Sequence, residues 1–272
     1  MPLPVTRVVR SAWHRQGVTG GDRVIPEETP VAFTYNGGTH AVMMATPQNL
    51  EDFAVGFSLT EGIVATAADI LRLEIVEQEG GIELRMWLGE TTAAALSERR
   101  RHLAGPTGCG LCGIESLEEA VKPAARVGHG RTFRPSDIMA AMEALAPCQE
   151  LNLLTRAVHA AAFWQPEVGL VAVREDVGRH NALDKLCGVL AREARSAEAG
   201  LVLLTSRVSV EMVQKSAAIG APVVAAVSAP TALAVRTAKA AGITLVAVAR
   251  SDGFEIFTHP HRIADAAEAY GT

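Results

Sequence analysis

Short apolar runs alternate with helical patterns through the second half of the chain, and this alternation constrains the fold more than any other feature of the sequence. Apolar residues recur at helical spacing at Leu183, Leu186 and Leu190, and helices are also expected over residues 209–219 and 231–242. Because nearly continuous apolar strands are typical of sheets covered by helices, the sequence predicts an α/β layered domain with a largely parallel sheet. The runs interpreted as strands are residues 169–173, 201–204, 222–227, 243–249 and 254–257.

The first half of the chain is less regular and predicts a smaller α+β subdomain. Residues 30–45 read as an antiparallel hairpin, because Asn36-Gly37 is a favoured hairpin turn. Residues 49–63 carry apolar side chains at helical spacing, and residues 71–89 suggest two further strands around Gly80. Residues 97–113, rich in Arg and Gly without an apolar period, are interpreted as an exposed loop.

These patterns divide the 272 residues into three predicted parts. Residues 1–105 form the N-terminal α+β subdomain, residues 106–130 an exposed loop with a short helix, and residues 131–272 the larger α/β domain. The short helix is expected just after Cys112, because Ser116 and Glu119 have the spacing of a capping box.

Composition and charge exclude several classes of protein. Hydrophobic residues make up 49% of the chain and charged residues 20%, which excludes intrinsic disorder. A net charge of −5 and an aromatic content of 4% argue against nucleic-acid binding. Residues 1–16 lack the hydrophobic stretch of a signal peptide, and the longest uncharged stretch, residues 216–235, contains Pro222 and Pro230. We therefore expect a cytoplasmic protein without a membrane partner, whose cysteines are reduced thiols.

The pair Cys109 and Cys112 is the most informative candidate for chemistry. Two cysteines three apart can share a metal, form a redox disulfide, or present one nucleophile with a helper. Zinc usually needs four ligands, and Cys148 and Cys187 stand alone in predicted helical segments, so no permanent metal is predicted. Glycines on both sides of the pair let the backbone turn tightly and expose a sulfur atom to a large partner. The basic run at 99–102 favours the thiolate, whereas the glutamates at 115–119 oppose it.

Polar segments that follow the predicted strands are candidates for ligand binding. In an open α/β sheet, ligands bind beyond the carboxyl ends of the strands, and helix N-termini favour anions. These segments predict a ligand that carries phosphate groups. The alternatives are well-capped surface turns and, for residues 248–253, an ordinary hairpin turn. The candidate contacts are Arg179, His180, Asn181, Ser206, Arg207, Ser228, Val248, Ala249, Arg250, Ser251, Asp252 and Gly253.

Several long motifs in a fixed order resemble the formate dehydrogenase accessory sulfurtransferases, the FdhD family. The resemblance covers nearly the whole chain after about residue 20 and is far more specific than the cysteine pair alone. The motifs are EDFAVGFSLTEGI (51–63), GCGLCG (108–113), REDVGRHNALDK (174–185), SRVSVEMVQKSA (206–217) and SAPTALAV (228–235).

The resemblance implies a sulfur carrier. Such a protein takes sulfur from a cysteine desulfurase as a cysteine persulfide and sulfurates the molybdenum bis-guanine-dinucleotide cofactor before its insertion into formate dehydrogenase. It implies a cytidine-deaminase-like fold without the zinc site, the persulfide on Cys109, Cys112 as its partner, and cofactor contacts at residues 248–253. Arg156-Ala157-Val158 departs from the small residues expected before His159, which puts a role for His159 in doubt.

Three other functions stay open at this point. The cysteine pair is compatible with a disulfide oxidoreductase or a zinc-binding structural module, and the polar segments with a non-catalytic chaperone that binds the cofactor or formate dehydrogenase. Apolar, alanine-rich helices also favour a homodimer. The sequence leaves undecided which formate dehydrogenase is the client and whether the metal is molybdenum or tungsten.

Overall fold

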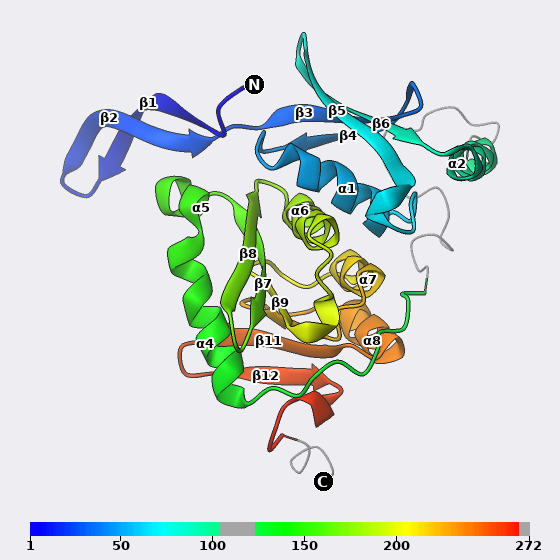
Figure 1. Cartoon of the computed structure of the whole chain (residues 1–272). Coiled ribbons are helices and arrows are strands. Elements are labelled where there is room, and N and C mark those ends of the chain that lie inside the picture. The colour runs from blue at the N-terminus through cyan, green and yellow to red at the C-terminus, as the bar shows by residue number, and fades with distance from the viewer. Residues whose placement is uncertain (104–122, 267–272) are drawn as a thin grey trace.

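The computed structural model describes residues 1–103 and 123–266, which form two sheet-based lobes and a projecting hairpin (Figure 1). The larger lobe contains a six-stranded sheet and the smaller lobe a four-stranded sheet. The hairpin is a separate two-stranded sheet. The predicted boundaries at residues 105 and 106 fall outside the described residues, so the division into three parts stays a prediction.

The six-stranded sheet is mixed, and the prediction of a largely parallel sheet is wrong. Its strand order is β12-β11-β10-β9-β7-β8, in which β9–β10 and β10–β11 are parallel and the other three pairs are antiparallel. The three parallel strands β9, β10 and β11 lie between the hairpin β7–β8 on one side and the antiparallel strand β12 on the other. The sequence does not reveal strand direction. The strands are β7 (His159–Gln165), β8 (Gly169–Asp176), β9 (Leu201–Leu204), β10 (Val223–Ala226), β11 (Thr244–Arg250) and β12 (Gly253–Thr258).

Helices cover both faces of this sheet, as expected for a layered α/β domain. Leu183, Met212 and Ala238 belong to the core on one face, and Ile138 and Leu145 to the core on the other. The sheet thus lies between two helical layers (Figure 1). The helices are α4 (Pro135–Leu145), α5 (Glu150–Thr155), α6 (Arg179–Arg192), α7 (Val210–Ala218) and α8 (Ala232–Ala241).

The smaller lobe is a four-stranded sheet of order β4-β3-β6-β5 that packs on one helix, α1. Phe33 of the sheet contacts Phe53 and Phe57 of α1. The predicted hairpin is confirmed, with Asn36 and Gly37 at positive φ in its turn. The elements are β3 (Thr29–Tyr35), β4 (Gly38–Ala45), α1 (Leu50–Thr60), β5 (Ile70–Gln78), β6 (Gly81–Leu88) and α2 (Glu90–Leu103).

Helix α2 corrects the expectation of a loop over residues 97–113. Residues 97–103 are helical, whereas residues 104–113 lie outside the described residues. Alanine, leucine, glutamate and arginine are strong helix formers, and they fill most of α2. Over residues 90–98, only Leu96 is buried in the core, with Ala93 packed against it, which accounts for the missing apolar period there.

The two lobes meet where α1 crosses α6, and two glycines permit this contact. A Cβ atom on Gly56 would lie 1.6 Å from the carbonyl oxygen of Asp184. A Cβ atom on Gly188 would lie 1.8 Å from the carbonyl oxygen of Asp52. The two backbones therefore approach too closely for any side chain at either position.

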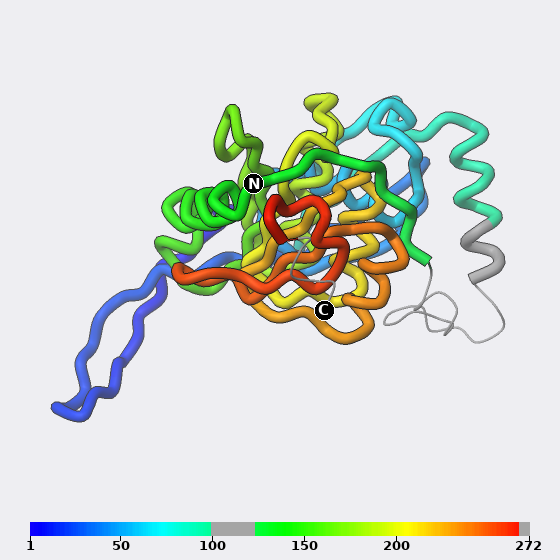
Figure 2. Tube along the Cα trace, turned by 90° about the horizontal axis from the view of Figure 1, so that it is seen from below, coloured from blue at the N-terminus to red at the C-terminus, as the bar shows by residue number. Residues whose placement is uncertain are grey.

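A long hairpin, here called the arm, projects from the body of the protein (Figures 1 and 2). It consists of β1 (Val5–His14) and β2 (Gly17–Pro26) in continuous antiparallel register. Near its base, the Arg23 Nη2 atom donates a hydrogen bond to the carbonyl oxygen of Thr155 in α5, at 3.2 Å. No pattern in residues 5–26 predicted the arm.

Candidate functional site

Connections from five strands meet at one edge of the six-stranded sheet, here called the loop edge. The parallel strands β9, β10 and β11 end together at this edge, which confirms the expected convergence of the polar segments that follow them. Strand β8 also ends there, because β7 is antiparallel to both β8 and β9. Strand β7 starts at the loop edge, where His159 pairs with Asp176. The loop edge comprises His159 and residues 177–181, 205–209, 227–231 and 248–253.

Hydrogen bonds tie the segments after β9, β10 and β11 to one another. The backbone N–H of Val208 donates to the carbonyl oxygen of Ala229 at 3.3 Å, and that of Thr231 donates to Val208 at 2.9 Å. The N–H of Val248 donates to the carbonyl oxygen of Ser228 at 3.4 Å. Segments that the sequence separates by about 20 residues therefore form one continuous surface.

Residues 248–253 belong to the β11–β12 hairpin, as the simpler interpretation expected: they comprise the end of β11, the two turn residues Ser251 and Asp252, and the first residue of β12. Arg250, Ser251 and Asp252 are exposed, whereas Ala249 is buried. The Arg250 guanidinium donates to the carbonyl oxygens of Val227 and Ala249. The bond to Val227 ties the end of β11 to the segment that follows β10. Hairpin geometry does not prevent a ligand contact, so the role of residues 248–253 stays a prediction.

The segment 174–181 was expected to connect a strand to a helix. In the structure most of it belongs to the strand and the helix themselves. Residues 174–176 are the end of β8, and Arg179 to Asn181 form the first turn of α6. Strand β8 is a half-exposed edge strand rather than a buried one over residues 169–174. The motif therefore extends from a strand into a helix, and its side chains face inward as well as outward.

Much of this motif forms buried contacts that join the two lobes. Asp176 and Lys185 are both 0% exposed, and Lys185 Nζ lies 2.6 Å from Asp176 Oδ2. Lys185 Nζ also donates to the carbonyl oxygen of Thr46, at 2.9 Å. Asn181 is buried, and its side-chain amide donates to Asp176 Oδ1 at 2.9 Å and to the carbonyl oxygen of Met44 at 2.8 Å. The predicted contact of Asn181 with a ligand stays untested, but its amide group is bonded within the protein.

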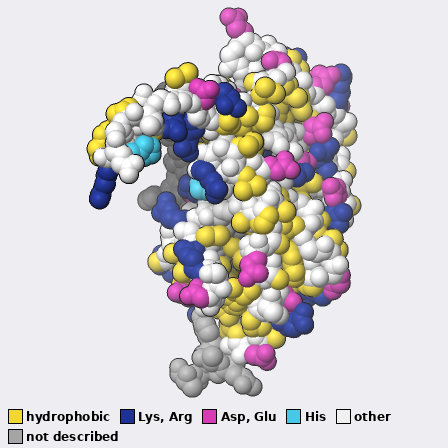
Figure 3. Space-filling view, turned by 90° about the vertical axis from the view of Figure 1, so that its left-hand side faces the viewer, with side chains coloured by type: hydrophobic (Ala, Val, Ile, Leu, Met, Phe, Trp, Pro, Cys, Tyr) yellow, Lys and Arg dark blue, Asp and Glu magenta, His cyan; other side chains and the backbone are white. Residues whose placement is uncertain are grey.

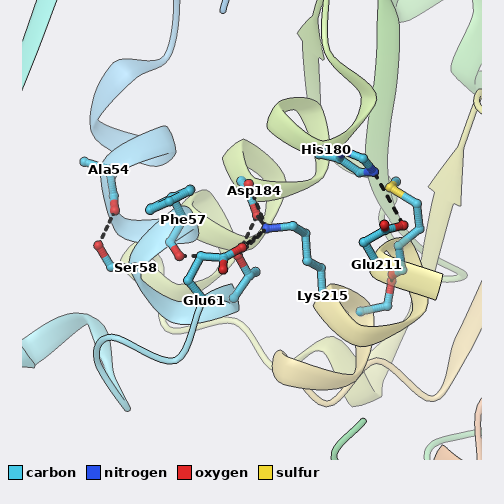
Figure 4. A network of polar contacts seen from close by, with 11 residues as sticks. Ala54, Phe57, Ser58, Glu61, His180, Asp184, Glu211 and Lys215 are labelled. Atoms are coloured by element: carbon cyan, nitrogen blue, oxygen red, sulfur yellow. Dashed lines mark hydrogen bonds and ion pairs between the residues drawn. The ribbon is translucent and has the colours of Figure 1, made fainter. Parts of the chain in front are cut away.

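A second buried network lies beside the loop edge, between α1, α6 and α7 (Figure 4). Lys215 Nζ lies 2.9 Å from Asp184 Oδ1 and 2.8 Å from Glu61 Oε1. It also donates to the hydroxyl of Thr60, at 3.0 Å. Burial alone would lower the pKa of Lys215, but the carboxylates of Asp184 and Glu61 outweigh burial and raise it.

Four buried polar side-chain atoms in the described part of the chain have no hydrogen-bond partner, and three belong to the loop edge. Buried polar atoms are nearly always bonded, so unpaired ones mark a place where a ligand or water completes the structure. The fourth, from Gln48, lies two residues after Thr46, whose hydroxyl accepts a hydrogen bond from the N–H of Val177 at 3.1 Å. Both lobes therefore contribute unpaired groups. The four atoms are Gln48 Oε1, Arg179 Nε, His180 Nε2 and Ser209 Oγ.

The N-cap residues of α7 and α8, both at the loop edge, differ in whether their side chains make a capping hydrogen bond. Thr231 caps α8, because its hydroxyl accepts a hydrogen bond from the N–H of Ala234 at 3.2 Å. Ser209 occupies the N-cap position of α7 but makes no capping bond with its side chain. Its hydroxyl makes no hydrogen bond of ordinary geometry, although it interacts with the nearby Glu211 carboxyl group and lowers the pKa of that group. It stands at the N-terminus of a nine-residue helix, where the helix dipole favours an anion.

Electrostatic interactions join His159, Arg179, His180 and Glu211 at the loop edge. Burial lowers the pKa of His180, and the Arg179 cation lowers it further, while Glu211 opposes the shift. Burial and Arg179 also lower the pKa of His159. His180 Nε2 lies 4.0 Å from Glu211 Oε2, which is too far for a hydrogen bond (Figure 4). At neutral pH both imidazoles are therefore uncharged, and Arg179 supplies the positive charge.

The remaining predicted residues lie close to this group or outside the described residues. Ser206 is buried, Arg207 is exposed and Ser228 is half-buried, all at the loop edge. Cys109 and Cys112 lie in residues 104–122, outside the described residues. Cys148 is exposed and free, whereas Cys187 is buried, and burial raises the pKa of its thiol.

Sequence reasoning missed Gln48 and Glu211 as members of the site. Gln48 belongs to the smaller lobe, and no local pattern links it to residues 130 positions later. Glu211 stands two residues after Ser209 in the motif at 206–217, and its position in the first turn of α7 places it near the candidate contacts.

Residues 1–103 and 123–266 contain no helix long and apolar enough to cross a bilayer. Over the same residues, histidine, cysteine and carboxylate side chains form no group of three that could hold a metal ion. The prediction about a permanent metal stays untested, because both cysteines of the pair lie elsewhere.

Comparisons with known proteins bear on the whole chain. The model of the FdhD/NarQ family matches residues 26–264. The chain is 55% identical to the sulfur carrier protein FdhD of Agrobacterium fabrum, over 94% of this chain and 95% of that protein. It is 50% identical to the protein of the same name in Cupriavidus necator, over 93% of this chain and 88% of that protein.

A solved structure shares the fold. The chain resembles a protein from Desulfotalea psychrophila that is described as a formate dehydrogenase accessory protein, with a TM-score of 0.76. The two are 26% identical, and the match covers 96% of this chain and all of the other.

The fold and the loop edge define a two-lobed α/β protein whose polar strand-to-helix segments gather beside the junction of its lobes. The family model and the relatives, which match nearly the full length of the chain, show which family of such proteins this is. The chain belongs to the FdhD/NarQ family.

Proposed function

We propose that this protein is a sulfur carrier in the maturation of formate dehydrogenase. It takes sulfur from a cysteine desulfurase as a persulfide on Cys109 and delivers it to the molybdenum bis-guanine-dinucleotide cofactor before the cofactor enters the enzyme. The observation that carries the proposal is the extensive identity to proteins named sulfur carrier protein FdhD, together with the pair Cys109 and Cys112. The cytidine-deaminase-like fold, the cytoplasm as the site of action and the homodimer belong to the same proposal.

Two thiols, those of Cys109 and Cys112, are enough to accept one sulfur atom and to release it as sulfide. The Cys109 thiolate attacks the terminal sulfur of the desulfurase persulfide, the donor S–S bond breaks, and the desulfurase leaves as a thiolate. Attack of Cys112 on the inner sulfur of the Cys109 persulfide then forms a disulfide and releases the outer sulfur as sulfide for the cofactor. The two cysteines supply the two electrons, and a cellular dithiol reduces the disulfide afterwards.

Intact-mass measurement tests the persulfide directly. After incubation with a cysteine desulfurase and cysteine, we expect an adduct of about 32 Da, one added sulfur atom, on wild-type protein and on Cys148→Ser. Cys109→Ser should lose the adduct and the activation of formate dehydrogenase. A wild-type protein without the adduct would overturn the carrier role and favour a non-catalytic chaperone. Full activity of Cys109→Ser would have the same consequence.

Two further measurements separate the remaining alternatives. A dithiol redox cycle requires both cysteines, so activity retained in Cys112→Ser but not in Cys109→Ser argues against a disulfide oxidoreductase. It would also mean that a cellular thiol can replace Cys112 in displacing the sulfur from Cys109. Stoichiometric zinc in protein purified without chelators would identify a structural zinc module instead.

The loop edge is the proposed site for the guanine-dinucleotide cargo. Its phosphates suit the N-termini of α6, α7 and α8, the Arg179 guanidinium and the unpaired hydroxyl of Ser209. The Arg250 side chain and the rest of residues 248–253 stand at the same edge, where exposed donors can reach a second part of the ligand. The unpaired atoms of Gln48 and His180 add an acceptor and a ring nitrogen for base or sugar groups.

Arg179→Ala is expected to act on two readouts. Loss of a charge-assisted contact should weaken the binding of guanosine diphosphate about tenfold or more, measured by calorimetry. Removing the cation should also raise the pKa of both His159 and His180, which NMR titration would detect. Arg195→Ala is the control, because Arg195 lies beyond the other end of α6 and pairs with Glu193. Unchanged nucleotide affinity in Arg179→Ala would remove Arg179 from the binding site.

A further inference from the structure

Glu211, on the first turn of α7, is a half-buried carboxylate beside a site that favours anions. Arg179, Arg207 and Arg250 supply positive charge at the loop edge. The β11–β12 turn lies at the left in Figure 1, and Figure 3 shows that Lys and Arg side chains gather on this side of the molecule, below the arm. A carboxylate in such surroundings repels phosphate groups, so it indicates that a different part of the ligand lies next to Glu211.

The cation that the sequence offers to Glu211 is bound elsewhere. Glu211 and Lys215 stand four residues apart on α7, the spacing at which a glutamate and a lysine on one helix usually pair. Lys215 instead turns toward Asp184 and Glu61, at 2.9 and 2.8 Å (Figure 4). Among the described residues, the one ion-pair partner within 4.0 Å of Glu211 is the imidazole of His180, which is uncharged at neutral pH.

The Glu211 carboxylate is ionised at neutral pH. Burial raises its pKa, but the Ser209 hydroxyl, the backbone N–H of Glu211 itself and the Arg179 cation outweigh burial, so its pKa lies below the usual value. An ionised carboxylate accepts hydrogen bonds and donates none. The ligand group that lies beside Glu211 must therefore carry N–H or O–H donors.

Glu211 and His180 face each other across a gap that no hydrogen bond closes. Figure 4 shows the two side chains directed toward one another from α7 and α6. His180 Nε2 lies 4.0 Å from Glu211 Oε2, and this nitrogen is buried without a hydrogen-bond partner in the described part of the chain. A flat polar group of a ligand at this place would bond to the carboxylate and lie against the imidazole.

Among the common nucleotide bases, guanine fits a carboxylate best. Its N1–H and its 2-amino group are neighbouring donors in one plane, and the two oxygens of a carboxylate can accept from both at once. Adenine, cytosine and uracil each place at least one lone pair opposite a carboxylate on the corresponding edge. Glu211 would therefore attract guanine and repel the other bases, and specificity needs both effects.

We propose that Glu211 is the residue that selects guanine, because its carboxylate accepts hydrogen bonds from the N1–H and the 2-amino group of the base. The inference rests on the guanine-dinucleotide cargo of the proposed function and names the side chain that distinguishes this cargo from other nucleotides. It is independent of the sulfur chemistry of Cys109. Lys215 has an indirect part, since its bonds to Asp184 and Glu61 leave the Glu211 carboxylate available to the ligand.

Calorimetric titration of the full chain with four ligands tests the proposal. Wild-type protein should bind guanosine diphosphate about 100-fold more tightly than adenosine diphosphate. Glu211→Gln should weaken the binding of guanosine diphosphate about 10- to 100-fold. Pyrophosphate should bind to Glu211→Gln at least as tightly as to wild-type protein, because the variant removes a negative charge. Effects of opposite sign on two ligands also show that the variant is folded.

Inosine diphosphate, which lacks only the 2-amino group of guanine, gives the sharpest result. Wild-type protein should prefer guanosine diphosphate to inosine diphosphate about tenfold, and in Glu211→Gln this preference should fall to about onefold. A purely structural role of Glu211 would weaken both ligands equally and keep the preference. Glu143→Gln is the charge-matched control, because Glu143 is exposed on α4, which covers the other face of the sheet.

The possible failures separate this inference from the proposed function. Equal binding of the three nucleoside diphosphates by wild-type protein, or a tenfold preference that persists in Glu211→Gln, would overturn the role of Glu211 and leave the phosphate contacts of the loop edge in place. Wild-type protein that binds neither guanosine diphosphate nor pyrophosphate would overturn the loop edge as the cargo site together with this inference. The persulfide adduct on Cys109 would still test the sulfur carrier role by itself.

Discussion

Lys185→Met is expected to lower the free energy of unfolding by about 3–5 kcal/mol, because it leaves a buried carboxylate without its cation. Asp176 would keep its hydrogen bonds from the N–H groups of Thr46 and Gly178 and from the Asn181 amide, but its charge would face no counter-charge in a fully buried site. Met matches the length of the lysine stem, so the packing loss is small and the electrostatic loss dominates.

Denaturant unfolding monitored by circular dichroism measures this effect. Lys239→Met on α8 is the control, since Lys239 is exposed and a surface change of this kind should stay within about 0.5 kcal/mol. Asp176→Asn/Lys185→Met removes both charges and should recover part of the loss. A decrease below about 1 kcal/mol in Lys185→Met would show that the pair does not hold the lobes together.

Gly188→Ala is expected to destabilise the protein by about 3 kcal/mol or more, at the upper end of overpacking effects. The new methyl group would meet the backbone carbonyl of Asp52, which cannot rotate away as a side chain can. Helices α1 and α6 must therefore separate. That movement also stretches the ion pairs of Asp52 with Arg174 and Arg192, at 2.8 and 2.5 Å.

The melting temperature should fall by roughly 6–12 °C for such a loss in a chain of this size. Gly89→Ala is the matched control, because a Cβ atom there meets nothing within 4 Å and its φ is not positive. Gly56→Ala should resemble Gly188→Ala, and the double variant should lose less than the sum, since both disturb one contact. A Gly188→Ala protein as stable as Gly89→Ala would contradict the close crossing of the helices.

In the larger lobe, the positions of strands and helix ends could be predicted, because they depend on local sequence patterns. The runs at 201–204, 222–227, 243–249 and 254–257 are strands, and Gly242 ends α8 in the left-handed conformation, as a helix-terminating glycine does. Strand direction was not predictable, because it depends on which strands pair rather than on their composition. The arm escaped prediction because its exposed strands bury no face and so lack a clear alternating pattern.

The location of the candidate site could be predicted from the sequence, but the contacts of its individual side chains could not. Strand-to-helix connections and helix N-termini located the loop edge, and Arg179 and His180 do carry unpaired atoms there. Asn181 shows the limit, because a polar residue in the same turn bonds to Asp176 and to Met44 of the other lobe. Only the fold brings Met44 to α6, so no local pattern distinguishes these roles.

The shared charges between the lobes also have a consequence for synthesis on the ribosome. Asp52 pairs with Arg174, which is made 122 residues later. At translation rates of 5–20 residues per second, Asp52 is synthesised about 6–25 s before its counter-charge exists. During that interval the face of α1 that later contacts α6 is exposed on the nascent chain. A chaperone that covers this face of α1 would therefore act in this period.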